Sequence, residues 1–216
     1  MEASEEAVFE SVGQAVHVSF LIMAQEAKQD APLRAALIRA MESVQLSGRQ
    51  RCWLDQLRGE QSGSINFGGL DGNEVRAQCA MVLQAVKHRL PKAEMWVLQA
   101  KYGQTDYEDV EGKRRFAFSP ERIDAIKGLA DYLAPLIANV PARAVDCLLG
   151  LIFANHKKVD ITFRDIAQSF GGSHVKYFRA AVKLKKHLRQ LEQMALDRLE
   201  ARFAAQGVTN QFTESI

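Results

Sequence analysis

The stretch from Ile161 to Leu191 limits the fold most, because it has the pattern of two helices joined by a very short turn. Thr162, followed three residues later by Asp165, is a looser form of the Ser/Thr-x-x-Glu capping box and predicts a helix start. Apolar residues then recur at i, i+3, i+4 and i+7, which predicts a short amphipathic helix. Its expected buried face is Phe163, Ile166, Ala167 and Phe170.

The expected turn consists of two glycines and a serine. Gly171 and Gly172 can adopt positive φ and end the first helix, and Ser173 offers a hydroxyl to cap the second. Ala167 supplies a small residue where the two helices would cross. This spacing favours a helix-turn-helix over residues 162–190, a motif that many proteins use to read DNA. An ordinary αα-hairpin with a solvated basic face is the alternative.

The second helix of this pair is expected to be strongly basic. Between Gly171 and Gln190 there are six Lys or Arg residues and no Asp or Glu, so the helix could approach phosphates without carboxylate repulsion. Ser173 and His174 are expected closest to base edges. The full set of candidate DNA-binding residues is Ser173, His174, Lys176, Arg179, Lys183, Lys185 and Lys186.

The same stretch resembles the last domain of bacterial primary sigma factors, which reads the −35 promoter element. The matching features are Thr162, the Ile166-Ala167 pair, Phe170, Ser173 and the exit through Leu188-Arg189. Two positions depart from the sigma pattern: Gly172 replaces an apolar turn residue, and Phe178 stands where the pattern carries a DNA-contacting arginine. The resemblance therefore implies DNA binding but no particular base preference.

A short chain with such a reader is similar to phage late-gene antitermination proteins of the Q type. The closely spaced cysteines of their zinc module are absent, which makes the chain similar to the zinc-free branch. The resemblance implies binding to double-stranded DNA near a late promoter, in a bacterial host cell. It also implies action on paused RNA polymerase, with or without a sigma factor, so that terminators are read through. Whether a second copy of the protein binds the same DNA site is left open by the resemblance.

Two other functions remain as alternatives. One is a sigma-like or repressor-like regulator of initiation, which would use the same reader. The other is a nucleic-acid-processing enzyme that uses the acidic residues near 106–111 to hold a divalent cation. A solvated loop is the simpler interpretation of that acidic-to-basic segment, and the chain is expected not to be an enzyme.

Composition agrees with a soluble globular protein of one domain or a small pair. The chain has 216 residues, of which 47% are apolar and 25% are charged. Because the net charge is only +2, a DNA-binding surface must arise from charge segregation along the chain. No run of 18 apolar residues and no basic-then-apolar N-terminal order occurs, so a cytoplasmic protein without membrane contact is expected.

No cofactor or metal is expected. Cys52, Cys79 and Cys147 lie far apart, and the five histidines show no metal-ligand spacing, so three reduced thiols are expected. The glycine-rich run over 59–72 lacks a Gly-Lys-Ser/Thr ending, which argues against nucleotide hydrolysis.

An all-α fold is expected from the helical periodicities. The expected organisation is an N-terminal helical segment over 1–58, a glycine-rich linker over 59–72, a helical DNA-binding domain over 73–206 and a flexible tail over 207–216. Helix starts are expected next to three prolines, and one long final helix is expected from about 174 to 206. The prolines are Pro91, Pro120 and Pro141.

Two apolar groups are candidates for binding a protein partner such as polymerase. In the first, Trp53 lies among three arginines and could stack on a base or pack on a protein, with a core role as the alternative. This group is Arg49, Arg51, Trp53 and Arg58. The second is Leu191, Met194 and Leu199, on the distal part of the last helix, with pairing to another helix as the alternative.

Overall fold

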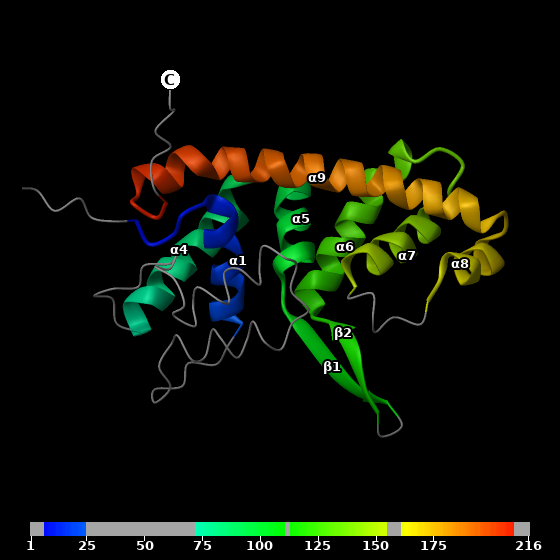
Figure 1. The fold of residues 1–216 in the computed structure, drawn as a ribbon, viewed down its shortest axis with the longest axis horizontal. Helices are drawn as coiled ribbons and strands as arrows, with labels where there is room; N and C mark the ends of the chain where they lie inside the picture. The colour runs from blue at the N-terminus through cyan, green and yellow to red at the C-terminus, as the bar shows by residue number, and fades with distance from the viewer. Residues whose placement is uncertain (1–6, 25–71, 111–112, 155–160, 210–216) are drawn as a thin grey trace, which may run out of the picture. The chain divides into compact units, whose positions relative to one another are not determined.

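The computed structural model describes residues 7–24, 72–110, 113–154 and 161–209, and for residues 107–110 and 113–116 it describes the backbone only (Figure 1). These residues form an all-α fold with one β-hairpin, which confirms the expected fold class. The chain divides into two compact units, one of Met1–Leu90 with Leu196–Ile216 and one of Pro91–Ala195. We refer to them as unit 1 and unit 2.

Unit 1 is built on α1 (Val12–Met23) and α4 (Gly72–Arg89), which pack against each other. Ser11 caps α1 by accepting a hydrogen bond from the backbone N–H of Gln14. At the other end of α1, Arg76 of α4 donates to the carbonyl of Ile22 at 3.2 Å. The core of unit 1 includes the buried side chains Val12, Ala15, Val16, Val75, Cys79, Val82 and Val86. Burial raises the pKa of the Cys79 thiol to about 11, so it stays protonated at neutral pH.

The C-terminal end of the chain also belongs to unit 1. Phe9 pairs with Thr209 in a parallel β-bridge, and the Phe9 N–H donates to the carbonyl of Val208 at 3.0 Å. All three residues are buried. The expectation of a flexible tail from 207 is therefore wrong for Val208 and Thr209, whose burial with Phe9 stabilises the chain end, whereas residues 210–216 lie outside the described part.

Unit 2 is a chain of packed helices. α5 (Lys92–Tyr102) packs on α6 (Pro120–Leu133), α6 packs on α7 (Ala142–Phe153), and α7 packs on α8 (Phe163–Phe170). A short 3-10 helix, η1 (Ala134–Leu136), follows α6. The three expected helix starts are confirmed, because Pro91 and Pro141 are N-caps and Pro120 is the first residue of α6.

A β-hairpin joins α5 to α6 (Figure 1). Its strands are β1 (Thr105–Val110) and β2 (Lys113–Phe118), and they pair antiparallel. The expectation of a loop over this acidic-to-basic segment is wrong. The register places Glu108 opposite Arg115 and Asp109 opposite Arg114, so acidic positions of one strand oppose basic positions of the other. Opposite charges across a strand pair favour the hairpin.

The last helix, α9 (His174–Ala205), has 32 residues and a length of about 48 Å. This confirms the expected long final helix. Its residues up to Ala195 belong to unit 2, and the rest belong to unit 1. The expected single domain over 73–206 is thus distributed over both units, while the boundaries expected at 58 and 59–72 lie outside the described residues.

Candidate nucleic-acid interface

α8 begins at a complete capping box, as the sequence predicts. The Asp165 N–H donates to Thr162 Oγ1 at 3.4 Å, and Asp165 Oδ2 accepts from both the N–H and the hydroxyl of Thr162 at 2.7 Å. These hydrogen bonds hold the pKa of the Asp165 carboxyl below its ordinary value. Of the expected buried face of α8, only Ile166 is buried, while Phe163, Ala167 and Phe170 are half-buried.

The turn between α8 and α9 depends on two glycines with positive φ. Gly171 has φ 78° and ψ 162°, and Gly172 has φ 91°. The conformation of Gly171 lies in a region that is essentially restricted to glycine. The backbone N–H of Lys176 donates to Ser173 Oγ at 3.4 Å, which caps the start of α9. The positive φ expected at Gly171 and the helix cap expected at Ser173 are therefore confirmed.

Tyr177 fixes the turn from the side of α9. Its ring is fully buried, and its hydroxyl donates to the carbonyl of Gly171 at 2.7 Å. A buried aromatic bonded to the turn holds the first residues of α9 in one orientation relative to the end of α8. Local sequence patterns do not single out Tyr177, which the structure places on the buried face of α9.

We expect Gly171→Val to lower the free energy of unfolding by about 1–3 kcal/mol, chiefly through backbone strain. No atom lies within 4 Å of a Cβ built at Gly171, so the added β-carbon itself meets no neighbour. Gly150→Ala is the matched control, because Gly150 lies inside α7 with equally open space and no positive φ. That control should be neutral or stabilising by about 0.5–1 kcal/mol. Equal unfolding midpoints in urea for both variants would contradict the strained turn.

The buried face of α9 is regular over its first half. Tyr177, Ala181, Leu184, Leu188 and Leu191 are buried, at alternating spacings of four and three residues. Such spacing places them along one face of a helix. Leu184 is completely buried and marks the direction of the core. Residues two or five positions from Leu184 therefore point away from the core.

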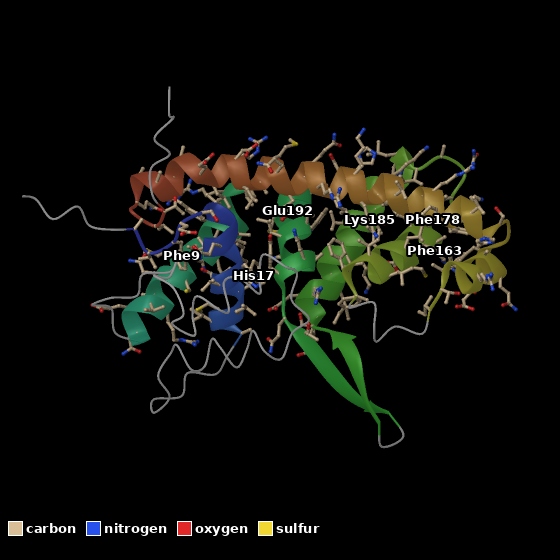
Figure 2. The ribbon with its side chains drawn as sticks, viewed as in Figure 1. Phe9, His17, Phe163, Phe178, Lys185 and Glu192 are labelled. Atoms are coloured by element: carbon tan, nitrogen blue, oxygen red, sulfur yellow. The ribbon has the colours of Figure 1, made fainter. Side chains whose placement is uncertain are left out.

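Most of the candidate DNA-binding residues lie on the exposed sides of α9. Lys183 and Lys185 flank Leu184 in sequence, so they point to opposite sides of the helix, and Figure 2 labels Lys185. Lys176 is half-buried, with Nζ 5.5 Å from the centroid of the Tyr177 ring. The exposed members of the predicted set are Ser173, His174, Arg179, Lys183, Lys185 and Lys186. Arg189 is exposed as well.

The carboxylates nearest to this basic segment on either side are already bound within the protein. Asp165 accepts the capping hydrogen bonds of α8. Glu192 of α9 accepts from Lys101 Nζ at 2.6 Å and from the Tyr102 hydroxyl at 2.8 Å, which ties α9 to α5 (Figure 2). No acidic residue lies between 171 and 190, so every charged side chain on the exposed side of α9 over this segment is cationic. Such a surface attracts polyanions.

Three exposed apolar residues on α9 were missed by the sequence analysis as parts of the site. Val175 is 40% exposed, and Phe178 and Val182 are each 53% exposed. Their spacing of three and four residues places them in one row. The Phe178 ring meets the Phe163 ring of α8 edge-on, with centroids 5.8 Å apart (Figure 2). The sequence does contain a sign of this exposed row. Residues 175–184 hold more large apolar side chains than one buried helix face can accommodate.

The candidate partner-binding residues have different outcomes. Leu191 and Leu199 are buried, which fits packing within the protein and excludes them from an exposed patch, and only Met194 of that group is exposed. These two leucines belong to the same buried stripe as Leu184, which continues along the helix. Arg49, Arg51, Trp53 and Arg58 lie outside the described residues.

A separate apolar groove of about 360 Å³ lies between α6 and α7. Its polar side chains are Lys127, Asp146 and Cys147. Burial and the nearby Asp146 raise the pKa of the Cys147 thiol, which disfavours the nucleophilic thiolate. Within the described residues no three His, Cys, Asp or Glu side chains are grouped to hold a metal ion.

Comparison with known proteins identifies no relative of this chain. No protein-family model matches this sequence, and no curated protein matches it either. In the parts of the chain that the structure describes, every helix is too short or too polar to cross a membrane.

Proposed function

We propose that this protein is a sequence-specific DNA-binding transcription regulator that reads double-stranded DNA with α8, the turn at 171–173 and α9. The observation that carries the proposal is the exposed side of α9 over residues 174–189. It presents cations on both flanks and contains no acidic residue. An α-helix fits the major groove of B-DNA, whose walls are phosphates.

In this proposal the two ends of the basic segment have different roles. Ser173 and His174 lie at the start of α9, next to the base edges, and Arg179 one turn further along reaches a guanine. Lys183, Lys185 and Lys186 contact phosphates. Lys176 contacts DNA after its ammonium group moves away from the ring of Tyr177. The rigid turn makes this geometry reproducible, which base reading requires.

The transcriptional role rests on the resemblance of residues 162–191 to the −35 reader of sigma factors. We propose a Q-like antiterminator from a phage or prophage, which binds near a late promoter and modifies paused bacterial RNA polymerase in the host cytoplasm. A sigma-like or repressor-like regulator of initiation is the second candidate, because the same reader serves it. A nucleic-acid-processing enzyme has less support, since the acidic segment forms one strand of a hairpin.

Base-reading and phosphate-binding residues should respond differently to substitution. Arg179→Ala is expected to weaken binding to a selected duplex by about 1–3 kcal/mol while changing binding to a random duplex little. Lys185→Ala, one of the flanking cations, should weaken binding to both duplexes nearly equally. Fluorescence anisotropy with labelled duplexes measures both. Equal losses on both duplexes for Arg179→Ala would make Arg179 a phosphate contact.

One transcription experiment separates the candidate functions. Purified bacterial polymerase transcribes a template with a promoter and a terminator, with and without this protein. Read-through of the terminator supports the antiterminator, and a change in promoter-dependent initiation supports the second candidate. Metal-dependent cleavage of the template would instead support the enzyme.

A further inference from the structure

We infer that the DNA sequence read by α9 contains thymines whose 5-methyl groups are contacted by Val175 and Val182. The inference rests on the proposed function and assigns a base class to its reading face. It starts from the exposed apolar row on α9, which the DNA-binding role of the cations does not by itself explain.

The two valines point away from the protein core. Val182 is two residues before the fully buried Leu184, which places it about 160° around the helix from the core direction. Val175 lies seven residues earlier, close to two full turns, and therefore points the same way. Their exposed fractions are 40% for Val175 and 53% for Val182. Both side chains occupy the centre of the face that would enter the groove.

The cations around this row indicate what covers it. Lys183 lies on one side of the valine row and Lys185 lies on the other, whereas Arg179, Lys186 and Arg189 project within about 60° of the row itself. An apolar row flanked by a cation on each side matches a major groove, where phosphates line both edges and base edges form the floor. The apolar group that bases present on that floor is the thymine methyl. Charge complementarity therefore favours DNA as the occupant over a protein partner.

Phe178 has a different role in the row. Its ring already packs edge-on against Phe163 of α8, so it braces the junction of the two helices. Val175 and Val182 are separated by seven residues, or about 10.5 Å along the helix axis. That distance exceeds the spacing of about 3.4 Å between neighbouring base pairs. We therefore expect the two valines to contact thymines of different base pairs.

Replacement of thymine by uracil tests this inference, because it removes the methyl group and keeps every hydrogen-bonding group of the base. The full-length protein first selects its preferred duplex from a randomised library. Uracil is then placed at each thymine in turn. At a contacted position we expect binding to weaken about fourfold, the value for one buried methyl-sized group.

The variants assign each methyl to a valine. In Val182→Ala the uracil effect should disappear at one position and persist at the other, and Val175→Ala should show the converse. Met194→Ala is the matched control, since Met194 is also exposed on α9 but lies beyond the basic segment. Its uracil effects should equal those of the unmodified protein.

The outcomes separate the inference from the proposed function. If no duplex is enriched, the proposal of sequence-specific binding fails, and the inference fails with it. If a duplex is enriched and depends on Arg179, but uracil at every thymine leaves its affinity unchanged, the thymine inference alone is overturned. The apolar row would then be assigned to a protein contact.

Discussion

Replacing Arg122 with methionine is expected to lower the free energy of unfolding by about 3 kcal/mol or more, which is the largest stability effect we expect in unit 2. Arg122 is only 6% exposed and joins three elements to α6. Nε donates to the carbonyl of Ala100 at 2.7 Å, Nη2 donates to the carbonyl of Phe153 at 2.9 Å, and Nη1 donates to Thr105 Oγ1 at 3.3 Å.

The physical reason is that the substitution leaves acceptors without donors. Methionine replaces the apolar stem of Arg122, so the two carbonyl groups and the threonine hydroxyl lose partners in a mostly buried site, and each loss costs about 1–3 kcal/mol. The guanidinium carbon also lies 4.8 Å from the centroid of the Phe118 ring, and that contact is lost too. Burial lowers the pKa of Arg122 to about 10, so the side chain is still charged at neutral pH.

Urea unfolding followed by circular dichroism measures this effect. Arg143→Met is the matched control, because Arg143 is an exposed arginine on α7, and its substitution should change stability by no more than about 0.5 kcal/mol. If Arg122→Met and Arg143→Met unfold at the same urea concentration, Arg122 does not hold α5, the hairpin and α7 together.

Replacing Lys183, Lys185 and Lys186 together with glutamine is expected to lower DNA affinity by about a hundredfold. These residues supply the phosphate contacts in our proposal, and each lost contact also lowers the salt dependence of binding. The slope of log affinity against log salt should become shallower by about 2.7, or 0.9 for each phosphate. The three side chains are exposed, so folding should be unchanged.

A charge-matched variant separates local contacts from net charge. Lys92, Lys127 and Arg143 are exposed cations of unit 2 that lie outside α9, and their replacement with glutamine removes the same number of charges. This control should retain most of the affinity and nearly the full salt slope. If both triple variants lose affinity equally, general charge and not the α9 surface would account for binding.

Local sequence signals predict the turn between α8 and α9 and its caps well. The capping box at Thr162, the positive φ of Gly171 and the cap at Ser173 each depend on a few neighbouring residues, and all three are confirmed. The prolines also predict their helix starts correctly from local chemistry. The proline ring fixes φ, and the missing N–H is a donor that the first turn of a helix does not need. Such features can be read without knowledge of the rest of the fold.

Features that depend on distant residues could not be read in this way. The burial of Val208 and Thr209 follows from pairing with Phe9, about 200 residues earlier in the chain. The hairpin is not predicted because its acidic and basic residues lie in separate runs along the sequence. Only strand pairing places them opposite one another, with Asp109 opposite Arg114. Val182 was passed over because a helical pattern does not distinguish an extra core residue from an exposed one.

The affinity ratio between a selected and a scrambled duplex tests the central claim most directly. Full-length protein is titrated at 150 mM salt into each duplex, and the two dissociation constants are compared. Sequence-specific reading by α9 predicts a selected duplex that binds about a thousandfold or more tightly than the scrambled one. A ratio near one, with both duplexes bound through salt-sensitive contacts, would contradict the account, because the basic surface of α9 would then bind DNA without reading it.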